Sequence, residues 1–283
     1  MKNILFVTDL DGTLMRDDKT ISDTSVKILN ELINEGTNIT YATARSIRSS
    51  ADITEKINFR IPVITRNGTV LSNPITKKNI KIVTFTESEL STIKECVNRH
   101  KMPGFVTSYV DGKETKFFLK ERMNIGFEDY LVQHKDDKRL RAVINENDMY
   151  EGDVCYFTFI AERDELEPVY EELCTDERWN CIFQKDKYRQ EYWLEICPYE
   201  ASKAKAIMKI KEKYKCDMVV VFGDSLNDVS MFEIADESYA VENAMEELKK
   251  IATAVIKSNN YDGVAEYLQR RFVNRMSVHW EDC

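Results

Sequence analysis

One stretch near the N-terminus sets the architecture: Ile4-Leu5-Phe6-Val7-Thr8-Asp9-Leu10-Asp11-Gly12-Thr13-Leu14. An apolar run ends in two carboxylates spaced two residues apart, and a glycine turn follows. Along an extended segment this spacing points both side chains to the same side. Two carboxylates held that close repel each other, so they require a cation or a shared proton. The stretch therefore predicts chemistry at Asp9 and Asp11.

Five short apolar runs end in polar or glycine residues, which is typical of strands buried on both faces of a parallel sheet. Helical patterns lie between them, the clearest at residues 22–35, which Gly36 terminates. This alternation predicts an α/β fold with a doubly wound, Rossmann-like parallel sheet. The five runs are residues 4–7, 39–42, 62–65, 218–222 and 254–256.

The middle of the chain has a different pattern. Thr86-Glu87-Ser88-Glu89 is a capping box that opens a helix, and Asp111-Gly112 between two strand-like runs predicts a hairpin. A helix near residues 165–173 must start late or bend, because Pro168 lacks a backbone N–H. We therefore predict an α+β domain inserted at 82–198, a core made of 1–81 and 199–272, and a loosely held tail at 273–283.

Composition narrows the class of protein. The chain has 283 residues, of which 43% are hydrophobic and 31% charged, as in a soluble globular protein. Its net charge of −9 disfavours nonspecific nucleic-acid binding. The seven cysteines form no CxxC pair and the three histidines show no ligand spacing, so no zinc site is expected. Without a secretory core or a long apolar segment, we expect a cytoplasmic protein with no membrane partner.

Residues suited to chemistry follow the predicted strands, where ligands of parallel sheets bind. Carboxylates there suit a hard cation, most plausibly Mg²⁺, while hydroxyl, amide and lysine groups suit a phosphate. Asp228 would orient a ligand or a metal-bound water, or simply cap a helix. Asn67-Gly68 fits a turn as well as a substrate contact. Arg45 fits a salt bridge as well as a substrate contact. The residues at these strand ends are Asp9, Asp11, Thr43, Arg45, Asn67, Gly68 and Asp224, and Lys203 opens a predicted helix.

Four motifs, in this order, resemble those of the haloacid dehalogenase (HAD) superfamily. They are Asp-Leu-Asp-Gly-Thr-Leu at 9–14, Ala-Thr-Ala-Arg at 42–45, Ser-Lys at 202–203 and Gly-Asp-Ser-Leu-Asn-Asp at 223–228. The long insert between the second and third motifs is similar to the cap of Cof-type (IIB) phosphatases. Arg66-Asn67-Gly68 and the segment 259–264 extend the resemblance, which covers residues 3 to 270. Ala44 departs from the pattern, because a glycine usually follows the threonine of the second motif.

The resemblance implies a Mg²⁺-dependent phosphoric monoester hydrolase that acts on a small phosphorylated metabolite. We expect sugar phosphates as the first class of substrate and flavin- or vitamin-related phosphates as the second. Asp9 would be the nucleophile that forms an aspartyl-phosphate, and Asp11 the general acid and base. Mg²⁺ would bind Asp9, the backbone carbonyl of Asp11 and Asp224, with Asp228 beside them. The inserted cap would exclude bulk water and select the leaving group.

The family pattern also implies a set of phosphate contacts and leaves two alternatives to hydrolysis. The contacts would come from Thr43, Lys203 and Asn227 and from the backbone amides of Leu10 and Ala44. One alternative is a phosphosugar mutase of the same superfamily, which returns the phosphoryl group to its substrate. The other is a ligand-binding or regulatory protein that keeps the fold without turnover, although the intact Asp9, Asp11, Lys203 and Asp224 argue against it.

Overall fold

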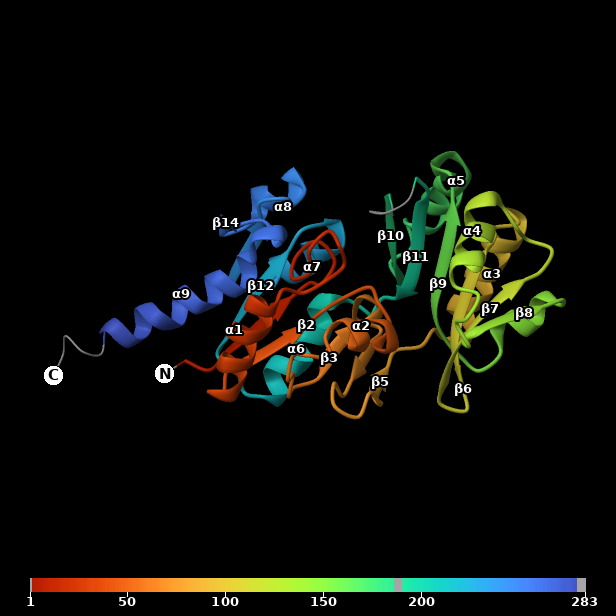
Figure 1. Ribbon diagram of the computed structural model, residues 1–283. Helices are drawn as coiled ribbons and strands as arrows, with labels where there is room; N and C mark the ends of the chain where they lie inside the picture. Colours follow the sequence, from red (N-terminus) through yellow and green to blue (C-terminus); the bar gives the residue numbers. More distant parts are fainter. Residues whose placement is uncertain (1, 186–189, 279–283) are drawn as a thin grey trace. The chain divides into compact units, whose positions relative to one another are not determined.

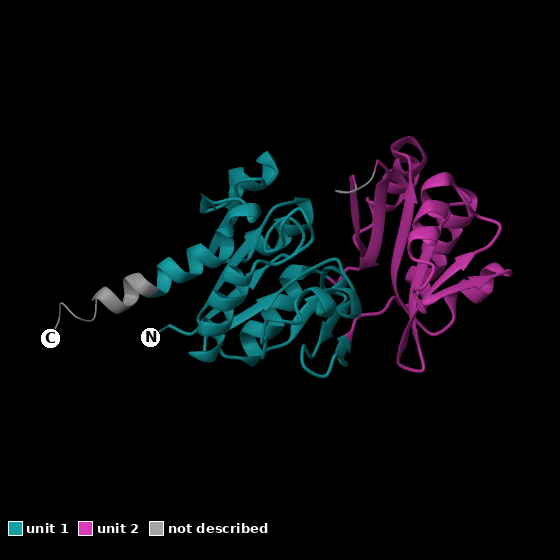
Figure 2. Cartoon of the chain, in the orientation of Figure 1, with its two compact units in different colours: residues 1–81, 202–283 teal, residues 82–201 magenta. Residues whose placement is uncertain are grey.

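The computed structural model describes residues 2–185 and 190–278, with side chains described up to residue 272. The chain forms two compact units (Figure 2). The core unit consists of residues 1–81 and 202–283, and the inserted unit of residues 82–201. The last helix of the chain continues to Val278, through the first part of the segment expected as a tail. Residues 279–283 of that tail lie outside the described residues.

The core unit contains a five-stranded sheet whose neighbouring strands are all parallel (Figure 1). All five residues of the strand Ile4–Thr8 are buried, which explains why its sequence is apolar from Ile4 to Val7. In spatial order the strands are β14 (Ala254–Ile256), β13 (Glu237–Val241), β12 (Met218–Gly223), β1 (Ile4–Thr8) and β2 (Asn38–Tyr41).

Helices cover both faces of this sheet. The step from β1 to β2 and the step from β12 to β13 run in opposite directions across the sheet, so right-handed crossovers place their helices on opposite faces. The predicted doubly wound α/β architecture is therefore confirmed. The helices are α1 (Asp23–Asn34), α2 (Ile47–Ile53), α6 (Lys203–Lys213), α7 (Val229–Glu233), α8 (Glu246–Ile251) and α9 (Gly263–Val278), with short 3-10 turns η1 (Arg66–Gly68), η3 (Leu226–Asp228) and η4 (Asn259–Tyr261).

The sequence placed four of the five expected runs correctly in the main sheet. The run at 62–65 instead forms β3 (Val63–Thr65) of a small separate sheet, with β4 (Val70–Ser72) and β5 (Asn79–Ile82). A single bridge between Ala42 and Ile64 joins this small sheet to the end of β2. Strand β13 was not expected, because its sequence mixes polar and apolar residues and is only partly buried.

The inserted unit is built on a six-stranded sheet in which only the β7–β8 pair is parallel (Figure 1). The predicted hairpin is confirmed: Asp111 and Gly112 turn between β6 and β7 with φ of 49° and 73°. In spatial order the strands are β10 (Trp179–Lys185), β11 (Tyr192–Pro198), β9 (Asp153–Ala161), β6 (Gly104–Val110), β7 (Lys113–Leu119) and β8 (Leu140–Val143).

Helices cover both faces of the inserted sheet as well. Phe105 and Val106 are consecutive on β6 and belong to different apolar clusters, so those clusters lie on opposite faces. The cluster with Val106 includes α3 (Glu87–Arg99) and α5 (Arg163–Leu173). The cluster with Phe105 includes α4 (Ile125–Gln133). A short 3-10 turn, η2 (Glu146–Tyr150), follows β8. Among the helices that the structure describes, none combines the length and apolar character needed to cross a membrane.

Helix α5 corrects one expectation. It begins at Arg163 and contains Pro168, so the late start that the sequence allowed is wrong, and the alternative of a bend stays a prediction. Proline inside a helix costs roughly 3 kcal/mol. Burial of Leu166, Val169 and Leu173 on the inserted sheet contributes about 1.5–3 kcal/mol per side chain. The apolar face of the helix therefore outweighs its one lost hydrogen bond.

Replacement of Thr86 by alanine should lower the free energy of unfolding of the chain by about 1 kcal/mol. The Thr86 side chain accepts from the Glu89 amide, and the Glu89 side chain accepts from the Thr86 amide at 2.6 Å. The change would remove the first of these two hydrogen bonds of the capping box. Urea unfolding followed by circular dichroism measures the loss. Ser91→Ala, an exposed change in the same helix, is the control and should stay within about 0.5 kcal/mol of wild type.

Candidate active site

The crevice between β1 and β12 brings the first and fourth motifs together. These strands are neighbours whose connections leave in opposite directions, which opens a binding crevice beyond their carboxyl ends. Thr8 lies level with Phe222, and the Asp9 amide donates to the Phe222 carbonyl at 2.9 Å. Asp9 and Asp224 thus leave neighbouring strands within one residue of the same height, although 215 positions separate them in the sequence.

Three buried carboxylates meet at this crevice. Asp9, Asp224 and Asp228 each place one oxygen within 4.8 Å of the others. Their exposed fractions are 4%, 5% and 0%. Oxygen atoms are the ligands that hard divalent cations take in proteins. The residues present therefore suit a divalent metal ion, and three of the four aspartates predicted as metal ligands lie in the cluster.

Lys203 is the buried cation of the site. Its Nζ donates to Asp9 Oδ1 and to Asp228 Oδ1, both at 2.6 Å. Burial by itself would lower the pKa of Lys203, but the carboxylates of Asp228 and Asp9 outweigh burial and raise the pKa above its ordinary value. Lys203 therefore remains an ammonium at neutral pH. In their ordinary charge states, three aspartates and one lysine leave these four residues with two negative charges.

Asp228 caps a turn and holds the lysine at the same time. Its Oδ2 accepts from the amides of Asp224 and Ser225, at 2.9 and 3.1 Å, while Oδ1 accepts from Lys203. Asp228 thus closes the capping box of η3 and makes no side-chain cap at α7, the helix that it enters, while its expected role toward a ligand or a metal-bound water stays a prediction. Both of its oxygens already have protein donors, so it orients its neighbours from fixed hydrogen bonds.

Gly68 lets the chain bring Lys203 to the carboxylates. It has φ of +97°, and a Cβ at this position would lie 2.1 Å from the Ser202 carbonyl oxygen. Only glycine allows η1 to approach the N-terminus of α6 this closely. Asn67 is buried, has φ of 50° and accepts at 3.3 Å from the amide group of Asn227. The turn interpretation of Asn67-Gly68 therefore describes their backbone, and the turn lies at the site.

Asp11 is held apart from the other three aspartates. Arg45 donates to it twice, from Nε to Oδ2 at 2.7 Å and from Nη2 to Oδ1 at 2.6 Å. Both side chains are 23% exposed. The Asp11 side chain is not part of the carboxylate cluster found among the described residues. The salt bridge expected for Arg45 is therefore present, and its expected contact with substrate stays a prediction.

The remaining predicted phosphate contacts lie around the same crevice. Thr43 follows β2 and is 1% exposed, and its Oγ1 accepts from the Arg45 amide at 3.2 Å. The Thr43 carbonyl accepts from the Asn67 amide at 3.0 Å, which links the second motif to η1. Within the described ranges, the backbone amides of Leu10 and Ala44 donate to no protein acceptor. These two N–H groups are available to an anion.

Residues that brace the site were not predicted as site residues. Thr13 Oγ1 donates to Asp224 Oδ1 at 3.1 Å and so ties the first motif to the fourth. Asn243 Nδ2 donates to the Gly12 carbonyl at 2.8 Å, and Asn259 Nδ2 to the Met15 carbonyl at 2.9 Å. Thr13 lies inside the quoted motif, and the two asparagines follow β13 and β14. Polar residues just after strand ends are therefore the signal that identifies them.

Comparison with known proteins agrees with this geometry. A family model described as haloacid dehalogenase-like hydrolase matches residues 6–268. The chain is 27% identical to the 5-amino-6-(5-phospho-D-ribitylamino)uracil phosphatase YitU of Bacillus subtilis, over 96% of this chain and 98% of that protein. It is 27% identical to the putative phosphatase YkrA of the same organism, over 94% and 96%. The solved structure of TM0651 from Thermotoga maritima matches with a TM-score of 0.72 and 25% identity, over 95% and 97%.

Replacement of Lys203 by methionine should destabilise the metal-free protein by about 3–5 kcal/mol, because it leaves buried carboxylates without their cation. The pKa of Lys203 is raised above 10.5 in the folded state, so its stabilising charge is fully present below that pH. It is lost only as pH rises through the folded pKa. The difference between the two proteins should therefore be constant from roughly pH 6 to pH 9.

Urea unfolding in the presence of a chelator measures this difference. Lys213→Met is the matched control, since Lys213 is exposed in the last turn of the same helix. The control should lose no more than about 0.5 kcal/mol. Equal stabilities of the Lys203 and Lys213 variants would contradict the assignment of Lys203 as the buried partner of Asp9 and Asp228.

Proposed function

The chain belongs to the haloacid dehalogenase-like hydrolases and is a phosphatase, and from the geometry of its site we propose a Mg²⁺-dependent hydrolysis through an aspartyl-phosphate on Asp9. The substrate would be a small phosphorylated metabolite. One observation carries the proposal: the buried Asp9 carboxylate lies 2.6 Å from Lys203 and within 4.8 Å of two further carboxylates. A carboxylate held next to a lysine cation in this way suits nucleophilic attack on phosphorus.

Asp9 would act first. Its oxygen forms a bond to phosphorus as the bond from phosphorus to the alcohol oxygen breaks, and the leaving alcohol takes a proton from Asp11. Water then attacks phosphorus, the bond to Asp9 breaks, and Asp11 takes the proton of the water. Arg45 occupies both oxygens of Asp11 in this structure and favours its carboxylate form, so Asp11 must leave this pair to carry the proton that it donates. Lys203 orients Asp9 through Oδ1 and offsets the negative charge that the phosphoryl group brings.

The metal would be held by Asp9, by Asp224 and by the backbone carbonyl of Asp11. Asp228 would act from outside, because both of its oxygens already accept hydrogen bonds from the protein. When bound, Mg²⁺ offsets repulsion between the nucleophile and the anionic phosphoryl group and polarises that group. The all-oxygen donor set and the two uncompensated negative charges of the four buried residues favour this ion.

Backbone and side-chain donors would surround the phosphate oxygens. We assign this role to the amides of Leu10 and Ala44, to Thr43 Oγ1, to Lys203 and to Asn227. The two amides support the assignment most directly, since they have no acceptor among the residues that the structure describes. Asn67 and Gly68 would border the same pocket on the side of Asn227. Amide donors fixed by the backbone cost no reorganisation when charge develops on the phosphoryl group.

The substrate we propose is a sugar phosphate or sugar-alcohol phosphate. Similar proteins named YitU, YwtE and YcsE, all from Bacillus subtilis, are named as phosphatases of 5-amino-6-(5-phospho-D-ribitylamino)uracil. That compound carries its phosphate on a ribityl chain, a sugar alcohol, joined to a pyrimidine. It therefore combines the two substrate classes expected from the sequence, the sugar phosphates and the flavin-related phosphates.

Replacement of Asp9 by asparagine should reduce phosphate release to background, because an amide oxygen is too poor a nucleophile to form the acyl-phosphate. The change conserves shape, so far-ultraviolet circular dichroism should match wild type. Asp18→Asn, an exposed change in the same loop region, is the control and should keep full activity. Hydrolysis by the Asp9 variant at the wild-type rate would remove Asp9 from the mechanism.

A screen of phosphorylated metabolites with Mg²⁺ should give phosphate release from sugar and sugar-alcohol phosphates and little from nucleic acid. Chelation should abolish release, and added Mg²⁺ should restore it. The mutase alternative predicts instead that the phosphoryl group moves between two positions of the substrate with little free phosphate. Chromatography of the sugar products alongside a phosphate assay separates these results. Full activity after chelation would contradict the proposed metal dependence.

A further inference from the structure

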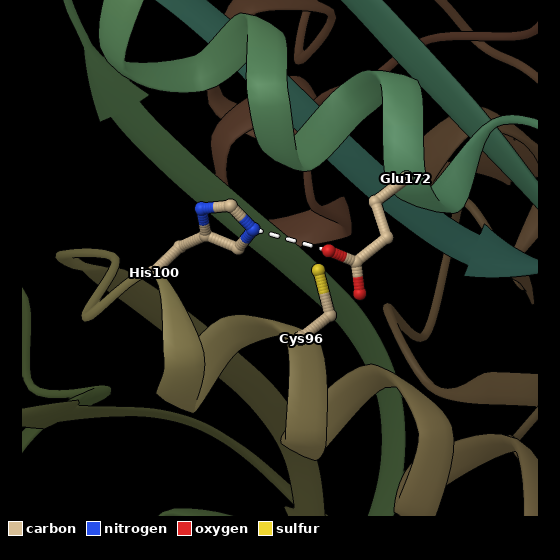
Figure 3. Close-up of side chains that lie close together, drawn as sticks. All are labelled: Cys96, His100 and Glu172. Carbon is tan, nitrogen blue, oxygen red and sulfur yellow. Dashed lines mark hydrogen bonds and ion pairs between the residues drawn. The ribbon is translucent and has the colours of Figure 1, made fainter.

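The inserted unit carries a second group of metal-ligand side chains, separate from the carboxylate cluster: Cys96, His100 and Glu172 (Figure 3). One ligand atom of each residue lies within 4.8 Å of the other two. Figure 3 shows the Cys96 sulfur and the His100 ring both turned toward the Glu172 carboxylate. We propose that these three residues bind a zinc ion, or a transition-metal ion of similar preference, and that the ion clamps α3 to α5.

The two helices create ligand spacing that the sequence alone does not show. Cys96 lies in the last turn of α3, and His100 is the C-cap residue of that helix. Residues four apart on a helix face the same side, one turn from each other. Glu172 comes from α5, which packs against α3. The four-residue spacing of Cys96 and His100 was missed in the sequence, and the third ligand lies 72 positions beyond His100.

The distances are close to those of a tetrahedral zinc site. Zinc bonds of about 2.0–2.1 Å to nitrogen and oxygen and about 2.3 Å to sulfur place ligand atoms roughly 3.3–3.6 Å apart. His100 Nε2 and Glu172 Oε2 are already 3.1 Å apart. All three ligand atoms lie within 4.8 Å of one another, so a small side-chain contraction completes the geometry.

The ligand atoms of Cys96, His100 and Glu172 do not suit Mg²⁺, the ion proposed for the active site. One sulfur, one imidazole nitrogen and one carboxylate oxygen suit zinc and its neighbours, whereas Mg²⁺ prefers oxygen alone. Three protein ligands leave a fourth position for water. The chain would thus separate two kinds of metal by chemistry, with oxygen donors in the core unit and a mixed set in the inserted unit.

The surroundings support a ligand role for these side chains. Arg99 donates to Glu172 Oε1 at 2.9 Å and to Oε2 at 3.0 Å, and its side chain is 62% exposed. It can therefore remain on Oε1 and orient the carboxylate while Oε2 binds the metal. Burial first, and then Glu172, raises the pKa of the Cys96 thiol to about 12. Zinc binds the thiolate, so binding at Cys96 would release the proton of the thiol.

A cobalt titration of the full chain tests the site, because Co²⁺ replaces zinc and its bond to a thiolate absorbs in the near ultraviolet. Metal is first removed with a chelator, and the titration is run in excess Mg²⁺ to saturate the carboxylate cluster. We expect one equivalent of Co²⁺ to bind with the thiolate band. Cys96→Ser and His100→Gln should each weaken this binding by about 100-fold or more. Loss of a residue that only hydrogen-bonds a metal ligand has a smaller effect.

Two matched variants serve as controls. Cys216→Ser removes another buried thiol, in the core unit, and His134→Gln removes the histidine that caps α4 as His100 caps α3. Both should bind Co²⁺ as wild type does. His100→Cys should retain binding and increase the thiolate band, because it exchanges one ligand for another.

Circular dichroism first checks that each variant folds. The His100 side chain is 27% exposed, so the His100→Gln and His100→Cys pair decides the matter should Cys96→Ser fail to fold. The proposal is overturned if wild type shows no thiolate band at one equivalent, or if the Cys96 and Cys216 variants titrate alike. Loss of binding in both His100 variants would also overturn it. The three residues would then be a hydrogen-bonded contact between two helices.

Discussion

A lysine buried between carboxylates is the interaction on which the site depends. Lys203 is 1% exposed and bonds to both Asp9 and Asp228, yet it neutralises only one of three buried negative charges. Buried charges are tolerated when they are paired, and the two that remain favour a divalent cation. The same imbalance costs the metal-free protein stability and suits the site to a divalent cation.

The fold meets this constraint by bringing distant segments to one end of a parallel sheet. β1 and β12 bring Asp9 and Asp224 to within one residue of the same height, and Thr13 ties the two motifs together. The lysine arrives from α6, whose first turn approaches Gly68 so closely that no side chain fits there. Fixed hydrogen bonds hold each of these groups. Preorganised charge of this kind contributes most to catalysis by stabilising the transition state.

Much of this was predictable from the sequence. Continuous apolar runs identify the buried strands, and the residues that follow them identify the crevice. Other features depend on contacts that no local pattern encodes. The bidentate pair of Asp11 and Arg45 joins two loops, and Pro168 remains inside α5 because apolar burial outweighs its cost. The polar strand β13 and the Cys96 cluster likewise exist only through tertiary neighbours.

The most direct test of the central claim is a crystal structure of the chain with Mn²⁺ in place of Mg²⁺, in which anomalous scattering locates the ion. We predict one ion in the crevice, bonded to carboxylate oxygens of both Asp9 and Asp224, with Lys203 still bonded to Asp9 and Asp228. An ion bonded to only one of these two aspartates, or none in the crevice at saturating Mn²⁺, would contradict the claim that the buried charges form a single metal site.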